Sequence, residues 1–330
     1  MAISQDPQAP LIVVCGATGI QGGSVIEALA ESDKPYRFRG LTRDTNKPVA
    51  RALVSRGVEM LQVDLKVENE LNVVEAFKGA KISFVRLYVF MPKSYVDGLE
   101  FSQVVTNFWE HKNKQREIDE GQMLVRVSKT VGVSLLVWSG LESVSELSGG
   151  RLTHVFHFDS KAAVTRYAQE IGVPFVNVQA GQYASNYTQH WRPRKQADGS
   201  YRIKLPWNPD SVAPVIDMVA DYGIFVREAI EEPVFGAGTE ILTCGEMLSF
   251  RDAAAQLSQS KNITYIQTSA EEFAAQGRMP VIEVEDIRQS LIEYGYYGGK
   301  DIAPSLMHLA RMPRTFAEFA KEQDWEAIID

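Results

Sequence analysis

The stretch VCGATGIQGGSV, residues 14–25, decides the fold. Gly16, Gly19 and Gly22 follow the spacing G-x-x-G-x-x-G between an apolar run and an amphipathic segment. In a dinucleotide-binding turn, the first glycine permits the tight turn, the second lets the backbone approach a pyrophosphate, and the third lets helix and strand pack closely. The N–H groups that begin the next helix then face the phosphates. A purely structural turn is the alternative, and the strand–turn–helix context favours the cofactor site.

The first half of the chain repeats the order strand then helix. Apolar, β-rich runs at 11–15, 36–42 and 58–64 alternate with amphipathic segments at 22–32, 47–57 and 69–79, and buried strands at 133–140 and 173–181 flank a helix at 160–172. This alternation is typical of βαβ units, which form a parallel sheet with helices on both faces. We therefore predict an α/β fold with a Rossmann-like doubly wound parallel sheet.

The end of the second predicted strand, GLTRDTNK at 40–47, indicates which dinucleotide is bound. An NAD site carries an acid at this point, whereas this chain has Arg43, 21 positions after Gly22. A planar, permanently charged guanidinium suits a 2′-phosphate, so the residue favours NADP(H). The alternative is that Arg43 is a solvated loop charge and that Asp44 binds the ribose.

The pattern changes after about residue 180. Aromatic, proline and glycine residues become frequent over 182–211, ADGSYRIKLP at 197–206 predicts a turn and a strand, and helical periodicity returns at 218–232, 250–260 and 315–330. We divide the chain into an NADP-binding Rossmann domain at 1–178 and a smaller α+β lobe at 179–330. That lobe would meet a substrate or a partner, with some of its segments returning to the sheet.

Composition limits the classes of function. The 330 residues are 45% hydrophobic and 23% charged, which indicates a globular fold, and a net charge of −8 disfavours direct nucleic-acid binding. Two cysteines, a start unlike a signal peptide and the lack of a long apolar run predict a cytoplasmic protein without a membrane segment, with the nucleus as a second location. Histidines and cysteines lack metal-ligand spacing, so we expect no metal.

The chain resembles the NmrA-like family of atypical short-chain dehydrogenases over nearly its whole length. The matching motifs are GATGIQGGSV (16–25), LTRD (41–44), VTNFWE (105–110), VWSGLESVSELSGGRL (137–152), HFDSK (157–161) and IGVPFVNV (171–178). Near relatives in this family bind NADP. Members include fungal transcriptional co-regulators that sense the redox state of the nucleotide, while others are described as oxidoreductases of biosynthetic pathways.

The resemblance implies a cofactor site, residue by residue. Residues that would wrap the pyrophosphate are Gly16, Ala17, Thr18, Gly19, Ile20 and Gln21. Arg43, with Lys47, would hold the 2′-phosphate, and Asp64 and Leu65 would lie near the adenine. Further along the cofactor would come Thr106, Asn107 and Phe108, then Lys161 at the nicotinamide ribose, and Gln182, Tyr183, Ala184 and Ser185 at the nicotinamide end.

Two departures from the family pattern matter. Residues 86–104 intervene between the fourth strand and the T-N-aromatic-W motif, and deleting them leaves ISFVVTNFWE, which the family pattern expects. We interpret the segment as a retained intron in the gene model; as a real insertion, it would reshape the cofactor pocket. In addition, Asp119 stands where near relatives have a lysine close to the cofactor.

His157 and Lys161 decide between catalysis and binding. In ordinary short-chain dehydrogenases a tyrosine four residues before the lysine transfers the substrate proton, and the spacing i, i+4 puts both on one helical face. Here His157 takes the tyrosine position, and Ser139 matches the serine that polarises the substrate. His157 or Lys161 would supply the proton in an enzyme. In a protein that only binds NADP(H), Lys161 would pair with the ribose and His157 would serve helix capping or packing.

Other residues suggest a pocket and its occupant. Tyr183, Tyr187, Trp191 and Trp207 would line an apolar pocket or pack the lobe, while Asp217 and Asp221 are interpreted as structural groups at a helix start. Our leading hypothesis is an NADPH-dependent oxidoreductase acting on a small organic carbonyl or enone in fungal secondary metabolism. The alternative is a non-catalytic redox sensor that binds a transcription factor. Whether the protein forms a homodimer is left open.

Overall fold

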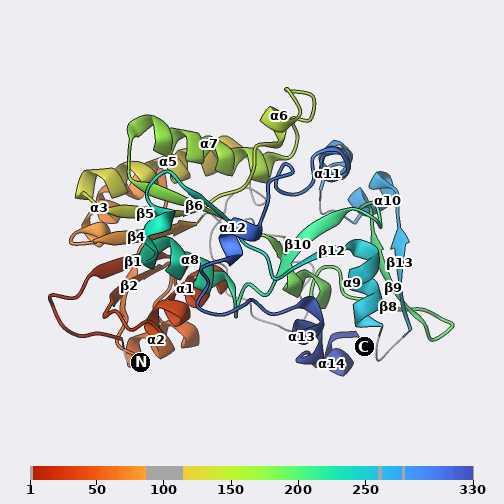
Figure 1. Cartoon of the computed structure of the whole chain (residues 1–330), viewed down its shortest axis with the longest axis horizontal. Helices are drawn as coiled ribbons and strands as arrows, with labels where there is room; N and C mark the ends of the chain where they lie inside the picture. Colours follow the sequence, from red (N-terminus) through yellow and green to blue (C-terminus); the bar gives the residue numbers. More distant parts are fainter. Residues whose placement is uncertain (1–2, 87–113, 259–261, 277–278, 330) are drawn as a thin grey trace.

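The computed structural model describes residues 3–86, 114–258, 262–276 and 279–329. Figure 1 shows a large lobe that contains the N-terminus and a smaller lobe that contains the C-terminus. The predicted α/β class and the smaller α+β lobe are confirmed. Of the proposed insertion at 86–104, only Arg86 is among the described residues. Thr106, Asn107 and Phe108 also lie outside them.

The large lobe is built on a seven-stranded sheet. Its strands lie in the order β3-β2-β1-β4-β5-β6-β11, and every neighbouring pair is parallel. The strand bounds are β1 (Leu11–Cys15), β2 (Arg37–Thr42), β3 (Glu59–Gln62), β4 (Ile82–Arg86), β5 (Leu135–Ser139), β6 (Phe175–Gln179) and β11 (Glu240–Leu242). The chain order reverses between β1 and β4. In an open parallel sheet, the crevice at such a reversal is where a ligand binds.

Helices cover both faces of this sheet (Figure 1). They are α1 (Ile20–Ala30), α2 (Pro48–Ser55), α3 (Glu70–Phe77), α5 (Lys114–Val131), α7 (Phe156–Ile171) and α8 (Tyr222–Glu231). Successive side chains of a strand point to opposite faces. Ile12 and Val14 accordingly belong to the core under α1 and α8, whereas Val13 and Cys15 belong to the core under α3, α5 and α7. Burial on both faces explains why LIVVC is a continuous apolar run.

The small lobe contains two three-stranded sheets. One holds β7 (Gln182–Tyr183), β10 (Val212–Ile216) and β12 (Glu246–Ser249), and the other holds β8 (Arg194–Lys195), β9 (Tyr201–Leu205) and β13 (Ile263–Gln267). Its helices are α9 (Phe250–Leu257), α10 (Ala270–Ala274), α11 (Val281–Glu293), α13 (Phe316–Lys321) and α14 (Trp325–Ile329). The remaining short helices are α6 (Val144–Leu147), α12 (Ala303–Leu306), η1 (Val67–Asn69), η3 (Ala184–Thr188) and η4 (Pro233–Phe235).

The second half of the chain contributes to both lobes and departs from its predicted periodicity at its end. Helix α8 packs on α1 and strand β11 extends the sheet, so both return to the large lobe; the division at residue 178 itself stays a prediction. The periodic segment 315–330 forms two helices instead of one, because Asp324 caps the second helix by accepting the N–H of Ala327 (3.2 Å). Within the described residues, every helix is too short or too polar to cross a membrane.

Candidate functional site

The glycine turn between β1 and α1 forms a cradle of backbone atoms. Gly16 has φ 67°, a conformation that favours glycine, and a Cβ on Gly22 would lie 2.3 Å from the Gly16 carbonyl oxygen. Gly19 is the N-cap of α1 and supplies no capping side chain. The first N–H groups of α1 are thus left for an anion rather than for a cap. This arrangement fits the pyrophosphate of a dinucleotide.

The ends of β2 and β3 lie beside this turn. The Thr18 and Thr42 hydroxyls are hydrogen-bonded at 3.2 Å, and Thr42 is the last residue of β2, so Arg43 directly follows the strand end that contacts the turn. Asp44 uses one carboxylate oxygen to accept the N–H of Asn46 (2.8 Å). Lys47 is the N-cap of α2, while Asp64 and Leu65 follow β3.

A second arginine, Arg86, lies at the same crevice. It ends β4 opposite Ser139 of β5, is only 4% exposed, and brings its guanidinium within 3.4 Å of where a Cβ on Gly19 would lie. A buried cation beside the N-terminus of α1 increases the attraction for a phosphate. The sequence interpretation overlooked Arg86 by assigning it to the insertion. The available signal was a charged residue at the end of an apolar parallel strand.

Lys161 is held by a buried carboxylate. Its ammonium Nζ lies 2.6 Å from Glu117 Oε1 of α5 and donates to the His157 carbonyl oxygen at 3.3 Å. The Ser160 hydroxyl donates to the other oxygen of Glu117. The side chains of Lys161 and Glu117 are 6% and 1% exposed, so water screens this ion pair little. One N–H of Lys161 remains for a ligand in the cavity that it lines.

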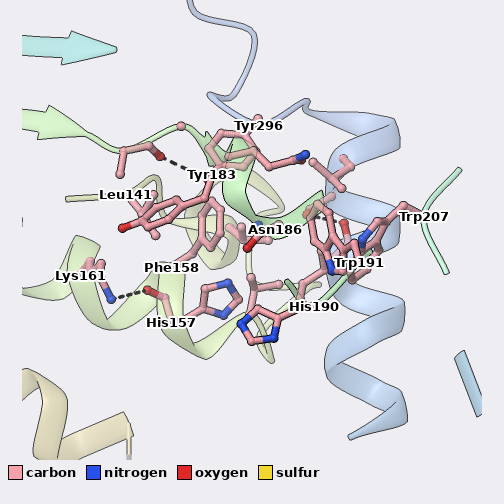
Figure 2. Close-up of a pocket in the computed structure, with 18 of the residues that line it drawn as sticks. Leu141, His157, Phe158, Lys161, Tyr183, Asn186, His190, Trp191, Trp207 and Tyr296 are labelled. Atoms are coloured by element: carbon pink, nitrogen blue, oxygen red, sulfur yellow. Dashed lines mark hydrogen bonds between the residues drawn. The ribbon is translucent and has the colours of Figure 1, made fainter. Parts of the chain in front are cut away.

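His157 lies one turn before Lys161 on α7, and both side chains line the same cavity, as the spacing predicts (Figure 2). The imidazole Nδ1 is 3.4 Å from Glu283 Oε1 of α11, a carboxylate that is 1% exposed. The ring also packs edge-on against Phe158 at 5.0 Å between centroids. A helix of the small lobe therefore fixes the group at the tyrosine position.

Ser139 connects the glycine turn to the cavity. Its hydroxyl donates to Gln21 Oε1 at 3.3 Å, and both residues are buried and line the cavity. Burial raises the pKa of the neighbouring Tyr222, whose hydroxyl donates to the Val178 carbonyl oxygen at 3.2 Å. Burial likewise raises the pKa of Tyr296, which donates to the Ala180 carbonyl oxygen at 3.2 Å. These two phenols stay protonated and engaged with backbone, so neither replaces the missing tyrosine.

The cavity has a volume of about 260 Å³ and lies between the lobes. Ile20, Gln21, Ser139 and Lys161 line it on the large lobe, and Trp191, Trp207 and Phe250 line it on the small lobe (Figure 2). Gln182, Tyr183 and Ser185 also line it. Ala184 is buried in the small-lobe core instead.

The predicted aromatic cluster divides between its two alternatives, since Tyr183, Trp191 and Trp207 line the cavity and Tyr187 packs the lobe. Tyr187 packs in the small-lobe core between Trp191 (5.4 Å) and Phe316 (4.9 Å) and does not line the cavity.

Asp217 and Asp221 are structural, as expected: Asp217 accepts the N–H groups of Val219 and Ala220, and Asp221 pairs with Arg311 at 2.6 Å. On the exposed side of α5, the Asp119 carboxylate accepts a hydrogen bond from the Gln115 side-chain amide at 2.8 Å. In the described ranges, His, Cys, Asp and Glu form no group of three that could hold a metal.

Comparison with protein families identifies one match. The model of the NmrA-like family matches residues 8–320. Among curated proteins, the chain is 26% identical over 236 residues to the NmrA-like family domain-containing oxidoreductase ptmS of Penicillium ochrochloron, covering 68% of this chain and 64% of that protein. It is 24% identical over 312 residues to the oxidoreductase FrzB of a Cladobotryum species, covering 89% and 86%.

Solved structures with the same fold include proteins described in two different ways. A negative transcriptional regulator, NmrA, solved with NADP, has a TM-score of 0.73 at 21% identity and covers 97% of this chain and 99% of its own. The NADPH-dependent quinone oxidoreductase QOR2 of Escherichia coli, solved with NADPH, has a TM-score of 0.68 at 19% identity, with 94% and 98% covered. At these identities the likeness shows the fold.

Proposed function

The chain belongs to the NmrA-like family, and from its site we propose that it is an NADPH-dependent oxidoreductase that reduces a small organic carbonyl or enone. The observation that carries the proposal is the cavity that joins Gln21 of the glycine turn, Ser139 and Lys161 to an apolar chamber. The fungal relatives described as oxidoreductases support a role in fungal secondary metabolism.

The cofactor would be held by backbone and by cations. The turn at 16–21 and the N-terminus of α1 would receive the pyrophosphate, with Arg86 beside them, and Arg43 with Lys47 would receive the 2′-phosphate. Titrating Arg43→Ala with NADPH and with NADH tests this assignment. NADPH affinity should fall about tenfold or more, because a charge-assisted contact is lost, while NADH affinity should change little.

The remaining chemistry is positioning and proton supply. NADPH held by these residues would supply the hydride for a new C–H bond at the carbonyl carbon as the C=O π bond breaks, and would become NADP⁺. Ser139, on releasing its hydrogen bond to Gln21, would donate one to the carbonyl oxygen, which must then gain one proton. Lys161 and His157 are the candidate donors that line the cavity. General-acid help of this kind is worth on the order of 10²–10⁴ in rate.

The second candidate function is a non-catalytic NADP(H) sensor that acts through a transcription factor. It is favoured by the carboxylates that hold both candidate donors, Glu117 on Lys161 and Glu283 on His157, and by the likeness to a transcriptional regulator. A sensor needs the nucleotide site and a surface for its partner, and it can dispense with proton transfer.

Metabolite profiling of the host separates the two functions. Wild type is compared with a deletion, with Lys161→Ala, and with Lys195→Ala as a control for loss of an exposed lysine on β8. If the protein is an enzyme, one precursor should accumulate in the deletion strain and in the Lys161→Ala strain. None should accumulate in the Lys195→Ala strain. Unrelated pathways that shift together, without a discrete precursor, would instead support the sensor. Folding of Lys161→Ala is checked by circular dichroism of the purified protein.

A further inference from the structure

The small-lobe end of the cavity is built from aromatic rings that other rings hold in place. Trp191 packs edge-on against Tyr187 (5.4 Å, 87°) and against Phe250 (6.1 Å, 64°), and Trp207 packs against Phe273 (5.8 Å). Tyr187 and Phe273 are buried in the lobe core behind these indoles. Since the indoles are fixed before a ligand arrives, a flat ring system can contact them with little loss of side-chain freedom.

The charge of the lining is the second observation. Among the described residues that line the cavity, none is Asp, Glu or Arg, and the ammonium of Lys161 is already paired with Glu117. The other polar groups on the small-lobe side are Asn186, Gln189, His190 and Ser290. At these described residues, a ligand carboxylate or phosphate would lose its water without meeting an arginine or an unpaired lysine, whereas a neutral oxygen would find hydrogen-bond partners.

We propose that the cavity takes an uncharged, flat aromatic or polycyclic compound and discriminates against its carboxylated or phosphorylated counterparts. The inference rests on the proposed function only for the orientation of the compound, with its carbonyl at Ser139 and its rings between Trp191 and Trp207. Phosphorylated sugars, nucleotides and acyl thioesters of coenzyme A fall outside this class because each carries phosphate.

The test compares two probes of nearly equal shape and different charge. 2-Acetylnaphthalene is a neutral ketone, and 2-naphthoate replaces its methyl ketone by a carboxylate. Binding to the full chain without added nucleotide is measured by calorimetry and by quenching of tryptophan fluorescence, so that no turnover occurs and no cationic nicotinamide ring can pair with the carboxylate. The ketone should bind roughly tenfold or more tightly than the carboxylate, because the latter's charge is left unpaired.

Two variants and a control locate the binding and the discrimination. Trp191→Ala should weaken ketone binding several-fold. Gln189→Arg adds a cation to the lining, so it should raise naphthoate affinity about tenfold while ketone affinity changes less than about threefold. Gln169→Arg makes the same substitution on the exposed side of α7, away from the cavity lining, and should leave both affinities unchanged. Circular dichroism confirms the fold of each variant.

Each outcome has one meaning. Equal affinities for the two probes, binding of neither, or ketone binding that is indifferent to Trp191→Ala would overturn the inference. The proposed function is tested separately, by measuring the oxidation of NADPH in the presence of the ketone or related enones. Tight, selective ketone binding without oxidation leaves the inference standing and counts against catalysis.

Discussion

Glu117 is the residue on which the state of Lys161 depends. It pairs with Lys161 across two helices, 44 positions apart, and accepts from Ser160 with its other oxygen. Removing one member of a buried ion pair leaves the other charge without compensation, which costs about 3–5 kcal/mol, whereas replacing both by apolar groups is often neutral. We therefore expect Glu117→Leu to lower the free energy of unfolding by about 3 kcal/mol, and Lys161→Met to lower it similarly.

The double variant makes this prediction specific. The variant that combines Glu117→Leu with Lys161→Met should lose much less free energy of unfolding than the two single variants lose together, as measured by urea unfolding. The exposed pair Lys78–Glu75 is the control, with side chains 64% and 65% exposed. There Glu75→Gln should change stability by less than about 1 kcal/mol. Additive losses in the Glu117–Lys161 cycle would show that the two residues act independently.

Local pattern explains which site residues could be predicted. The spacing i, i+4 placed His157 and Lys161 on one face of α7, and the position after a strand indicated Arg43, because both inferences need only the geometry of one element. Glu117 and Glu283 could not be found in this way. Each lies on a different helix from its partner, and which carboxylate meets which base depends on how those helices pack.

At the scale of elements, the contact of α1 with α8 depends on one glycine. A Cβ on Gly223 would lie 2.0 Å from the Ser24 carbonyl oxygen, and the Gly223 N–H donates to the Ser24 hydroxyl at 2.8 Å. Gly223→Ala must push the helices apart or break this hydrogen bond. We expect it to lower the free energy of unfolding by about 2 kcal/mol or more, since overpacking a core contact commonly costs 1–3 kcal/mol.

Gly23 in α1 is the matched control for this change. A Cβ there would meet only the Ala17 carbonyl oxygen, at 3.9 Å, so Gly23→Ala adds a methyl group to open space within a helix. It should be neutral or stabilise by about 0.5–1 kcal/mol, because alanine loses less backbone entropy on folding than glycine does. Equal effects of the two substitutions in denaturant unfolding would contradict the packing argument.

Three basic side chains hold helix α11 over the cavity. Arg151 pairs with Glu293, His154 with Asp286 (3.0 Å) and His157 with Glu283 (3.4 Å). Asp286 also accepts the backbone N–H of His154 at 2.9 Å. Helix α11 supplies Ile287 and Leu291 to the lining. These contacts join the large lobe to a wall of the cavity.

Asp286→Ala should loosen that wall without unfolding the protein. Loss of its hydrogen bonds is worth about 1–2 kcal/mol, which corresponds to amide exchange in α11 that is roughly tenfold faster. Hydrogen exchange followed by mass spectrometry measures this. Glu285→Ala is the control, since Glu285 pairs with Arg288 of the same helix, and its effect on α11 should be small. If α11 exchanges equally in both variants, the cross-lobe contacts do not hold it.

At the scale of the whole molecule, the cavity brings together residues from Ile20 to Tyr296. The alternation of strands and helices was enough to predict the sheet, because each βαβ unit buries its own apolar faces. It could not predict which later segments, α8 and β11, return to that sheet, nor that Tyr187 packs in the small-lobe core while Trp191 and Trp207 line the cavity. Those facts depend on how the small lobe folds back, and the segment 182–211 contains no repeating pattern that encodes it.

The charge of this cavity also predicts a preference between the two cofactor forms. The oxidised nicotinamide ring is cationic and the reduced ring is neutral, while the phosphates are the same in both. Among its described lining residues the cavity has no carboxylate that could stabilise a cationic ring, and its one ammonium, from Lys161, is paired with Glu117. NADPH should therefore bind about tenfold more tightly than NADP⁺, which adds about 1.4 kcal/mol of stabilisation at equal excess concentration.

Urea unfolding at saturating NADPH or NADP⁺ measures this difference for the whole molecule. Arg43→Ala should weaken both forms by the same factor, because it acts on the shared phosphate, and the preference should remain. Equal stabilisation by the two forms would contradict the argument from cavity charge. Both candidate functions are compatible with this preference, because it would help an enzyme to bind its reductant and a sensor to read the redox ratio. Turnover of a neutral ketone, lost in Lys161→Ala, is therefore the result that distinguishes the enzyme from the sensor.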